Sequence, residues 1–588
     1  MEIKKVGVLG CGTMGAGICE IVARSGYKVV FKEVDEARVD EGLERIKHSI
    51  DRGVSSGKMS EEERAQVLSR ISGSTVMSSL ADADLVVEAV PEFPHIKRKA
   101  FRELDETLSP DAIIATNTSS LSVIELAVAT QRPERVLGIH FFNPAPVMQL
   151  VELVKTVTSA PDVVQAAKSF VESLGKTPVV CRDRAGFIGN LLLFPYLNEA
   201  VKLLDAGFAS REDIDAAMRL GAGHPIGPLA LLDLVGLDSC AEILESLHRQ
   251  FEHQRYIPSP AFRHLVTAGY LGRKTGKGFY TYEEPDAPRV VADNRSGAAF
   301  TSAEQTNDIT SVGIVGTGVM ATGIAEVAAA AGFDVVLRGR SKDSLRTARE
   351  RIEKSTQRAV DKGKVPAEQR GETLRRISFT DTLEQAAMTG LVIESVAEDM
   401  ALKKQIFAAL DKAAPPETLL ATGTSSLPVV EMAAATSRPD KVMGLHFFNP
   451  ANLMKLVEIV RTVATSAQAL VDAEAAVIKM GKHAVFCGDR AGFIVNRLLF
   501  PYLNDAVKML EEGYASAEDI DTAMRLGCRH PMGPIELIDL VGLDVTLEIL
   551  KSLHAEFRED AFKPSPLLDY MVQAGYLGRK AGQGFFAY

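Results

Sequence analysis

Residues 5–15 read KVGVLGCGTMG, and this stretch decides the fold of the N-terminal part of the chain. The apolar run at 6–9 is typical of a buried strand, and glycines follow it directly in the order GxGxxG. A strand that leads into GxGxxG and then into a helix is the pattern of a dinucleotide-binding turn. Its glycines permit a tight turn, a close approach of pyrophosphate and close packing of helix on strand. The predicted cofactor-binding residues of this turn are Gly10, Gly12, Thr13, Met14 and Gly15.

The end of the next strand carries an acid that selects the cofactor. The apolar run at 29–31 leads to Glu33, about twenty residues beyond the glycines. A carboxylate there accepts both ribose hydroxyls and repels a 2′-phosphate, so it favours NAD over NADP. A glycine-rich structural turn with a surface Glu is the alternative interpretation.

The chain contains two copies of one sequence unit. The segment HFFNP at 140–144 recurs at 446–450, an offset of 306 residues, and the same offset relates Gly10 to Gly316. A period near 300 is far too long for a solenoid. The sequence therefore predicts a tandem duplication of a whole protein, whose copies end near Tyr282 and Tyr588.

Each copy divides into two predicted domains. Strand-like runs alternate with helical stretches such as 16–25 and 96–107, and after about residue 184 long helical periodicity takes over. The strand-like runs of the first copy are 6–9, 29–31, 85–89, 113–116, 136–139 and 150–154. The predicted fold class is α/β plus all-α: two tandem copies of a Rossmann-like doubly wound domain followed by a helical domain. The predicted boundaries are 1–184 and 309–490 for the Rossmann-like domains, 185–282 and 491–588 for the helical domains, and 283–308 for a linker.

The second copy has a less regular cofactor end. Its turn reads GTGVMA at 316–321, with Ala tolerated at the third position, and Gly339 stands where the first copy has Glu33. The loss of the acid and the gain of Arg340 allow three interpretations for this copy: NAD, NADP or weakened binding. The candidate cofactor residues are Gly316, Gly318, Val319, Met320 and Arg340.

A histidine and a glutamate form the candidate chemical centre. His140 lies just past the run 135–139, at the carboxyl edge where open parallel sheets place ligands. Glu152 lies inside the next apolar run, where a carboxylate without a partner would be costly. A His–Glu pair satisfies that carboxylate, and it is also how enzymes build a general base. A purely structural pair is the alternative interpretation.

Composition excludes several classes of function. The chain has 588 residues, of which 46% are hydrophobic and 24% charged, as in ordinary globular proteins. Its 77 acidic residues outnumber its 66 basic residues, which argues against a nucleic-acid binder. The sequence contains no uninterrupted run of about 18 apolar residues, so it predicts no membrane-spanning helix. Six cysteines without a CxxC pair indicate neither a zinc site nor a disulfide framework. We therefore expect a cytoplasmic protein with no metal and no membrane or nucleic-acid partner.

With these motifs the sequence resembles the 3-hydroxyacyl-CoA dehydrogenase family, particularly the short-chain bacterial 3-hydroxybutyryl-CoA dehydrogenases. The resemblance covers nearly the whole chain twice. Its most specific stretches are NTSSL at 117–121, HFFNP at 140–144 and DRAGFI at 183–188 leading to Asn190. The resemblance implies hydride transfer between C3 of a 3-hydroxyacyl-CoA and NAD, in either direction, within fatty-acid metabolism.

The resemblance also assigns roles to residues. His140 exchanges the hydroxyl proton, Glu152 orients His140, and Ser119 and Asn190 contact the substrate and its reacting oxygen. The same positions in the second copy are Ser425, His446, Glu458 and Asn496. Further implied cofactor residues are Glu92, Lys97, Asn117, Asn143, Glu398 and Lys403. A charged hairpin at 37–72 would contact CoA, with Lys58 as the candidate residue.

Other interpretations of these residues remain open at this point. Without the resemblance, Ser119 and Ser120 are helix caps, the run SVIE at 122–125 is a capping box, and Asn190 is a cap or turn residue. The replacement of Asn117 by Gly423 puts cofactor binding in the second copy in doubt.

Three functions compete. The leading one is a 3-hydroxyacyl-CoA dehydrogenase, followed by a dehydrogenase of a free 3-hydroxy acid or sugar acid. A non-catalytic dinucleotide-binding structural protein is the remote alternative. The resemblance also implies that the helical domains pair, so that the two copies would form an intramolecular pseudo-dimer with further homo-oligomerisation open.

Overall fold

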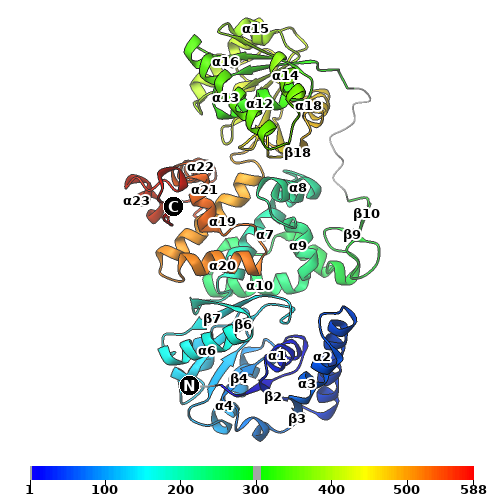
Figure 1. Ribbon diagram of the computed structural model, residues 1–588, viewed down its shortest axis with the longest axis vertical. Coiled ribbons are helices and arrows are strands. Elements are labelled where there is room, and N and C mark those ends of the chain that lie inside the picture. The colour runs from blue at the N-terminus through cyan, green and yellow to red at the C-terminus, as the bar shows by residue number, and fades with distance from the viewer. Residues whose placement is uncertain (1–2, 296–305) are drawn as a thin grey trace.

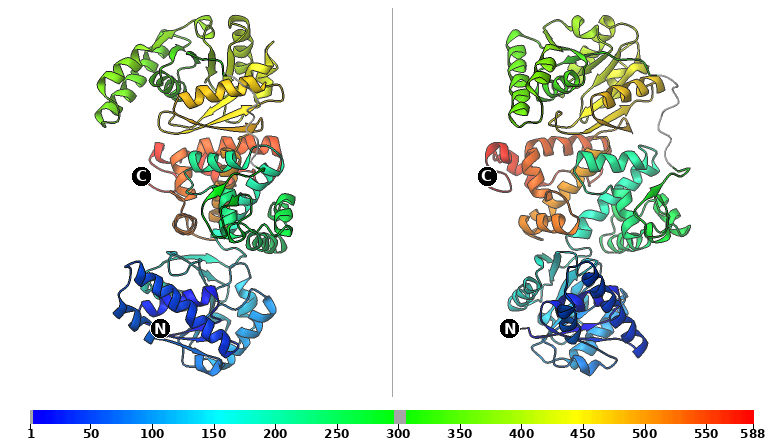
Figure 2. Two further views of the ribbon diagram at one scale, coloured as in Figure 1. Left: turned by 90° about the vertical axis from the view of Figure 1, so that its right-hand side faces the viewer. Right: turned by 45° about the vertical axis from the view of Figure 1, so that its right-hand side comes forward.

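The chain folds into two α/β domains and two helical domains, which a computed structural model describes for residues 3–295 and 306–588. The α/β domains lie at opposite ends of the molecule, with the helical domains together between them (Figure 1). The same arrangement is visible from two other sides (Figure 2). The predicted fold class is confirmed. No helix of the described ranges is both long and apolar enough to span a membrane.

The first α/β domain is built on an eight-stranded sheet in the order β3-β2-β1-β4-β5-β6-β7-β8. The strands are β1 (Lys5–Leu9), β2 (Lys28–Lys32), β3 (Ile71–Ser74), β4 (Leu85–Glu88), β5 (Ile113–Thr116), β6 (Val136–Phe141), β7 (Leu150–Lys155) and β8 (Thr177–Arg182). Its central strands are apolar runs buried on both faces, because helices cover both sides of the sheet. The strand order reverses between β1 and β4, and ligands bind at the carboxyl edge of such a switch point.

Helices cover the two faces of this sheet in separate groups. They are α1 (Thr13–Arg24), α2 (Glu36–Ser55), α3 (Glu61–Ser69), α4 (Pro94–Thr107), α5 (Val123–Ala127) and α6 (Pro161–Ser173). Helices α1, α2, α3 and α6 bury one face, and α4 and α5 pack on the other together with the first helix of the helical domain.

One part of the sheet differs from the sequence-based expectation. Strands β6 and β7 are antiparallel, because residues 142–149 are too few for the crossover that a parallel pair needs. The prediction that His140 lies just past its strand is wrong, since β6 runs on to Phe141. The register of the antiparallel pair places His140 directly opposite Glu152.

The first helical domain begins with a helix that is buried along most of its length. Its helices are α7 (Gly189–Asp205), α8 (Arg211–Gly221), α9 (Pro228–Val235), α10 (Leu237–Phe251) and α11 (Pro260–Thr267). The predicted linker at 283–308 begins with ordered structure, because β10 (Val290–Val291) pairs with β9 (Thr281–Tyr282). Residues 296–305 of that linker lie outside the described residues.

The second copy repeats this architecture, so the tandem duplication is confirmed. Its sheet has the corresponding order β13-β12-β11-β14-β15-β16-β17-β18. The strands are β11 (Ser311–Val315), β12 (Asp334–Arg338), β13 (Ile377–Thr380), β14 (Leu391–Glu394), β15 (Leu419–Thr422), β16 (Val442–Phe447), β17 (Leu456–Arg461) and β18 (His483–Gly488). The helices are α12 (Val319–Ala330), α13 (Lys342–Asp361), α14 (Ala367–Arg375), α15 (Leu383–Ala387), α16 (Met400–Ala413), α17 (Val429–Ala433), α18 (Ala467–Lys479), α19 (Val495–Glu511), α20 (Ala517–Gly527), α21 (Pro534–Val541), α22 (Leu543–Phe557) and α23 (Pro566–Gln573).

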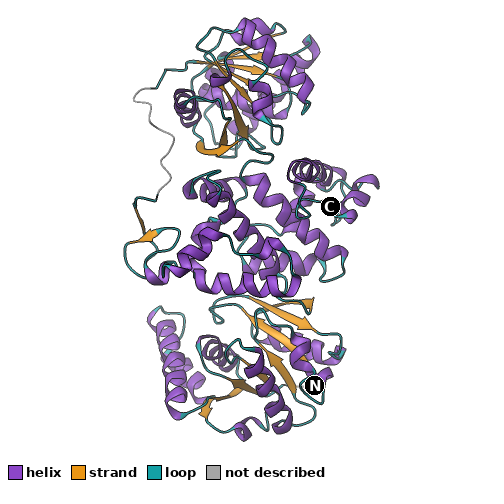
Figure 3. Ribbon diagram, turned by 180° about the vertical axis from the view of Figure 1, so that it is seen from behind, coloured by secondary structure: helices purple, strands orange, loops and turns teal. Residues whose placement is uncertain are grey.

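Each copy reaches across to the sheet of the other. Helix α20 contacts β7 and β8 of the first copy, and α8 contacts β17 and β18 of the second. The N–H of Arg182 donates to the carbonyl of Tyr514 at 3.2 Å, and the N–H of Gly488 donates to the carbonyl of Phe208 at 2.9 Å. These two bonds are equivalent under the repeat, so the crossing is reciprocal. One apolar core consequently runs through both helical domains, which lie between the sheets (Figure 3).

Candidate active site

The centre of the site is the His140–Glu152 pair. Nδ1 of His140 lies 2.7 Å from Oε2 of Glu152, and both side chains are buried. Oε1 of the same carboxylate accepts the backbone N–H groups of Ile188 at 3.0 Å and Gly189 at 2.8 Å. An ionised carboxylate only accepts hydrogen bonds, so it holds the proton of the imidazole on Nδ1. This leaves Nε2 as the nitrogen that can take up a proton from a ligand.

Aromatic rings surround the histidine. The ring of Phe142 lies 4.7 Å from that of His140 and the ring of Phe187 lies 5.5 Å away, measured between centroids. Neither ring offers an alternative hydrogen bond, so the imidazole keeps the orientation that Glu152 gives it.

The second copy has the same geometry. Nδ1 of His446 lies 2.6 Å from Oε2 of Glu458, whose Oε1 accepts the N–H groups of Ile494 at 3.0 Å and Val495 at 2.9 Å. The hydrogen-bonded His–Glu pair is therefore formed in both halves.

A second polar cluster lies at the ends of β4 and β5. Lys97 is buried and its Nζ lies 3.2 Å from Oε2 of Glu92. Oε1 of Glu92 accepts the N–H of Ser119 at 3.1 Å and also the hydroxyl of Thr118. Burial is the largest single effect and opposes ionisation of Glu92, but the charge of Lys97 and the hydrogen bonds from Thr118, Lys97 and Ser119 together outweigh it and lower the pKa of Glu92. The cluster thus keeps a carboxylate charged beside the NTSS segment.

Sequence reasoning missed the third member of this cluster. Glu88 is fully buried, its Oε1 lies 2.7 Å from Nζ of Lys97, and its Oε2 accepts the hydroxyl of Thr116 at 2.8 Å. Burial raises the pKa of Glu88 in spite of these partners. The signal was present in the sequence, since Glu88 ends the apolar run LVVE just as Glu152 interrupts its own run.

The equivalent cluster of the second copy joins Lys403, Glu394 and Glu398. Nζ of Lys403 lies 2.9 Å from Glu394 and 3.3 Å from Glu398, which accepts the N–H of Ser425 at 2.9 Å. As in the first copy, burial opposes ionisation, but the charge of Lys403 and the hydrogen bonds from Thr424, Ser425 and Lys403 together lower the pKa of Glu398.

Asn117 links the Glu92–Lys97 cluster to the strand that carries His140. Its Oδ1 accepts the N–H of Phe141 at 2.9 Å, which fixes the NTSS segment against the strand that carries His140. Gly423 has no side chain to make this bond in the second copy. The structure therefore places Asn117 as a support of the backbone beside His140.

The alternative interpretations of the serines and of Asn190 as helix caps are wrong. The side chain of Ser122 does not cap α5; instead Asp183 accepts the N–H groups of Val123 at 2.9 Å and Ile124 at 2.7 Å. Asn190 is the second residue of α7, behind Ile188 at the cap position, and it directly follows the Gly189 N–H that binds Glu152. Asn190 is half-buried, whereas Asn496 is buried.

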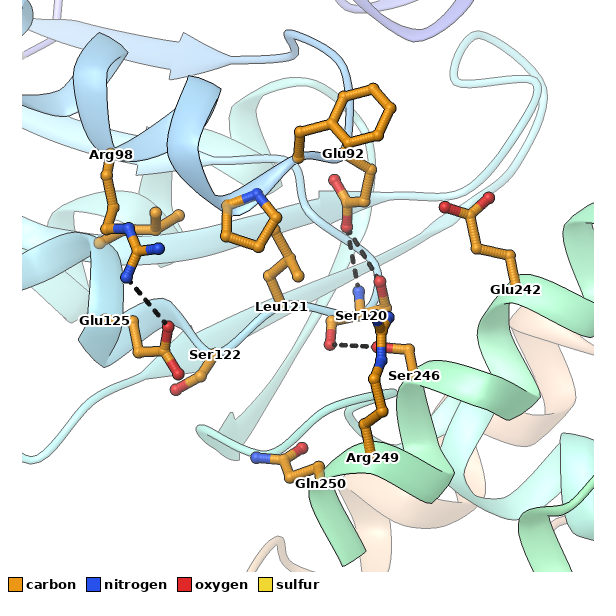
Figure 4. A pocket seen from close by; sticks show the side chains of 13 residues that line it. Glu92, Arg98, Ser120, Leu121, Ser122, Glu125, Glu242, Ser246, Arg249 and Gln250 are labelled. Atoms are coloured by element: carbon orange, nitrogen blue, oxygen red, sulfur yellow. Dashed lines mark hydrogen bonds and ion pairs between the residues drawn. The ribbon is translucent and has the colours of Figure 1, made fainter.

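A pocket of about 360 Å³ opens beside Glu92 and Ser120 (Figure 4). Figure 4 shows Ser246, Arg249 and Gln250 of α10 on its opposite wall. The pocket therefore lies between the sheet domain and the helical domain of one copy, where enzymes commonly bind ligands.

The glycine turn of the first copy fits a dinucleotide. A Cβ on Gly15 would lie 1.9 Å from the carbonyl oxygen of Gly10, so α1 and β1 pack closely only with glycine at this position. Gly12 faces open space, and α1 has neither a side-chain cap nor an acid in its first turn, which contains Thr13 and Met14. Its free N–H groups can receive a pyrophosphate. Glu33 lies beside the turn, with Oε1 2.6 Å from the N–H of Cys11.

The turn of the second copy has changed shape and charge. Gly316 adopts φ 137°, compared with 92° at Gly10, and Ala321 packs where the first copy needs Gly15. Gly318 faces open space like Gly12, and Val319 and Met320 begin α12. At position 339, which is equivalent to Glu33, Leu345 fills the space that a side chain would need, because a Cβ on Gly339 would lie 2.7 Å from Cδ2 of Leu345.

The predicted CoA residue, Lys58, lies away from the glycine turn. Lys58 is exposed between α2 and α3, where it lines a hollow with Arg24 at the C-terminal end of α1. Since α1 has 12 residues, that end lies about 18 Å from the glycine turn. In the second copy, a groove of about 270 Å³ joins the loop 449–453 to the equivalent Lys364. Only a long ligand can contact both ends of such a groove.

The two remaining predicted residues are exposed in loops that follow strands. Asn143 is exposed in the loop after β6, and Arg340 is exposed after β12. Within the described residues, no group of three or more His, Cys, Asp or Glu side chains is arranged to hold a metal ion.

Two family models match the chain, each of them twice. The model described as 3-hydroxyacyl-CoA dehydrogenase, NAD binding domain, matches residues 5–184 and 311–490. The model described as 3-hydroxyacyl-CoA dehydrogenase, C-terminal domain, matches residues 186–282 and 492–588. The expected resemblance is therefore confirmed, and NAD(H) is the cofactor class of the matched domain.

Individual relatives agree with these matches. A 3-hydroxybutyryl-CoA dehydrogenase of Mycobacterium tuberculosis is 46% identical over 282 residues, which is 48% of this chain and 99% of that protein. A 3-hydroxyadipyl-CoA dehydrogenase of Escherichia coli is 30% identical over 581 residues, which is 98% of this chain and 99% of that protein. The crystal structure of a 3-hydroxybutyryl-CoA dehydrogenase from E. coli matches with a TM-score of 0.70 at 28% identity, and the match covers 98% of this chain and 100% of that one.

Proposed function

Because the chain belongs to the 3-hydroxyacyl-CoA dehydrogenase family, which is represented twice along its length, we propose that it oxidises L-3-hydroxyacyl-CoA to 3-ketoacyl-CoA, or runs the reverse reduction. The relatives named 3-hydroxybutyryl-CoA dehydrogenases favour short acyl chains. The observation that carries the proposal is the His–Glu pair, which recurs with Nδ1–Oε2 distances of 2.7 and 2.6 Å.

The proposed chemistry assigns each group a task. Gly10, Gly12 and Gly15 would hold NAD at the glycine turn, where it would supply a hydride acceptor for C3. His140 takes the hydroxyl proton on Nε2, while Glu152 holds the ring and stabilises the imidazolium that forms. Ser119 and Asn190 donate hydrogen bonds to the reacting oxygen and to nearby substrate atoms. In the second copy His446, Glu458, Ser425 and Asn496 take these tasks.

Positive charge on the helical hairpin after the second strand of each copy supports a CoA thioester as the substrate. The groove of the second copy is lined by Arg351, Arg358, Lys362 and Lys364, which supply positive charge for phosphate groups. Lys58 is the equivalent of Lys364 in the first copy. We expect alanine at Lys58 and Lys364 to raise KM for acetoacetyl-CoA and to leave a free 3-keto acid unaffected. Turnover of the free acid alone would favour the free-acid alternative.

For the second copy we propose NADP as the cofactor. From the last residue of the second strand to the first residue of the following helix, the first copy has KEVDE at 32–36 and the second has RGRSK at 338–342. One cation and three anions are thus replaced by three cations and no anion. In addition, Nε of Arg338 is buried without a hydrogen-bond partner among the described residues. Positive charge at this point attracts a 2′-phosphate.

We also propose that the two copies form an intramolecular pseudo-dimer. The packing of α7 against α19 and the reciprocal crossing of α8 and α20 support it. The fusion raises the effective concentration of one half near the other. Light scattering should give the mass of one chain, and a mass of two chains would indicate additional self-association.

A spectrophotometric assay at 340 nm with acetoacetyl-CoA tests the proposal. The unmodified chain, His140→Ala and His446→Ala proteins are each compared with NADH and NADPH. We expect His446→Ala to prefer NADH and His140→Ala to prefer NADPH, and Arg340→Glu to lower kcat/KM for NADPH by about tenfold. Activity abolished by His140→Ala alone would show that the second half is not an enzyme. Fractionation of the producing cells would test the cytoplasmic location that the cysteine content favours.

A further inference from the structure

The catalytic pair of each half rests on a glycine of the other half. Gly527 is the last residue of α20, which lies against β7 and β8 of the first copy. A Cβ on Gly527 would lie 2.8 Å from Cδ2 of Leu150 and 3.6 Å from Cε1 of Phe142. The backbone of α20 therefore lies against Leu150 and Phe142, at the two ends of the β6–β7 connection, and a side chain at position 527 would have to displace Leu150.

Phe142 transmits this contact to His140. Its ring lies 4.7 Å from the imidazole, and a Cβ on Gly189 would lie 3.2 Å from its Cζ. Phe142 is thus held between His140, Gly189 of its own half and Gly527 of the other half. Gly189 also donates its N–H to Glu152, so the same small region holds both members of the pair.

The second copy has the reciprocal contact. Gly221 ends α8, and a Cβ there would lie 2.7 Å from Cγ2 of Val495 and 2.8 Å from Cδ2 of Leu456. The N–H of Val495 donates to Glu458, and Leu456 begins the strand that carries Glu458. The contact reaches the general-base pair through the glutamate here and through the histidine in the first copy.

The helices that deliver these glycines are also anchored at their other ends. Just before α20, the carbonyl of Tyr514 accepts the N–H of Arg182 at 3.2 Å, and just before α8, the carbonyl of Phe208 accepts the N–H of Gly488 at 2.9 Å. The start of each helix is therefore hydrogen-bonded to the edge strand of the opposite sheet, and the helix packs along that edge.

We propose that Gly527 is a positioning residue for the reaction of the first half and that Gly221 is a positioning residue for the reaction of the second half. Close-packed interiors transmit strain, so an added methyl group at either position displaces the neighbouring side chains by a few tenths of an ångström. A small displacement of reacting groups is costly for the rate, because a shift of about 1 Å can cost about a hundredfold. This inference rests on the proposed dehydrogenase function.

The test uses the full chain in two backgrounds, in which one site works at a time. His446→Ala leaves the first site and His140→Ala leaves the second. We expect Gly527→Ala to lower kcat about tenfold in the His446→Ala background and to leave the His140→Ala background unchanged. Gly221→Ala should do the opposite. Because each glycine lies in the half whose own site it leaves intact, the two variants are matched controls for each other.

Three further readouts separate positioning from general damage. KM for the nicotinamide cofactor should stay constant, whereas the pH profile of kcat should shift because the His–Glu hydrogen bond changes. Leu150→Ala should restore activity to Gly527→Ala, and Val495→Gly, which copies Gly189, should restore it to Gly221→Ala. If Gly527→Ala or Gly221→Ala alone folds poorly, the corresponding double variant still tests the contact.

The outcomes distinguish this inference from the proposed function. Equal losses in both backgrounds, or a loss confined to the half that carries the glycine, would overturn the crossed support. If the unmodified chain shows no turnover, the proposed function fails. Imidazole ¹⁵N spectra still test the contact that runs from Gly527 through Phe142 to His140. Gly527→Ala should shift the resonances of His140, which are assigned by their loss in His140→Ala, and unshifted resonances would refute the inference.

Discussion

The backbone N–H of Gly189 donates to Oε1 of Glu152 at 2.8 Å, so the carboxylate that orients His140 also ties the sheet to the first turn of α7. One side chain thereby couples the geometry of the proposed general base to the placement of Asn190, the next residue along that helix.

Glu152→Gln should abolish base function without unfolding the protein. The amide oxygen of Gln stays with the two N–H donors, Ile188 and Gly189, so its NH₂ group faces Nδ1 of His140. The imidazole proton is then on Nε2, which can no longer accept a proton. We expect kcat in the His446→Ala background to fall by a factor of about 10²–10⁴, measured at 340 nm. Glu458→Gln in the same background is the control, and equal losses from both changes would contradict the assignment.

Lys97→Met should destabilise the first α/β domain. It leaves the carboxylates of Glu88 and Glu92 without their cation, and breaking a buried pair costs about 3–5 kcal/mol. Urea unfolding followed by circular dichroism measures the change. The double variant Lys97→Met/Glu88→Leu should recover most of the loss, because it removes the unpaired charge at Glu88. Lys99→Met, on an exposed side chain, is the control, and a midpoint shift as small as its own would contradict this account.

Gly15→Ala should weaken NAD binding by the first copy. The added Cβ would lie 1.9 Å from the carbonyl of Gly10, which forces the turn to open as it has at Gly316. We expect KM for NAD to rise at least about tenfold in the His446→Ala background. Gly53→Ala on α2, where the nearest atom is 3.9 Å away, should leave KM unchanged. Equal KM values for the two variants would refute the steric argument.

The interface between the halves should weaken as the pH falls. His224 and His530 stack at 4.1 Å between ring centroids, hydrogen-bonded to Tyr196 and Tyr502, and burial lowers the pKa of His224 from 6.5 to about 4. Burial and the neighbouring His224 also lower the pKa of His530. The unfolded chain then takes up protons that the folded chain cannot bind, so stability is lost as the pH falls from 6.5 towards 4. The loss is about 1.4 kcal/mol per pH unit per histidine.

Unfolding free energies between pH 7.5 and 4.5 measure this effect. The variant His224→Phe/His530→Phe should flatten the pH dependence in that window, whereas His95→Phe, at an exposed position, should not. An unchanged slope in the double variant would show that other groups control the acid sensitivity.

The sequence predicted those features that a local pattern encodes. The repeat, the glycine turns and the apolar runs are visible within short windows, and Glu152 was identified because a carboxylate in a buried strand needs a partner. The same reasoning applied to Glu88 would have found its pair with Lys97. The antiparallel pairing of β6 and β7 was also accessible, since residues 142–149 are too few for a crossover.

Other features depend on residues brought together from distant parts of the chain. Asp183 caps α5 from about sixty positions away, where Ser122 had looked like the local cap. The contact of Gly527 with Leu150 and Phe142 joins the two copies, and no local pattern marks which glycine of a helix end will face another domain. Such contacts follow from the packing of whole domains, which local patterns do not determine.

The crossing of α20 onto β8 has a consequence during synthesis. Arg182, at the end of β8, contacts residues near 512–514, which the ribosome adds about 330 positions later. At roughly 5–20 residues per second, the nascent first half waits about 15–65 seconds for the helix that covers its edge strand. The second half has no such delay, because α8 has already emerged when β18 is made. The two halves of one polypeptide therefore mature in different ways: the edge strand of the first half stays uncovered, and open to pairing with other chains, until α20 is made, whereas the second half folds against a neighbour that has already been synthesised.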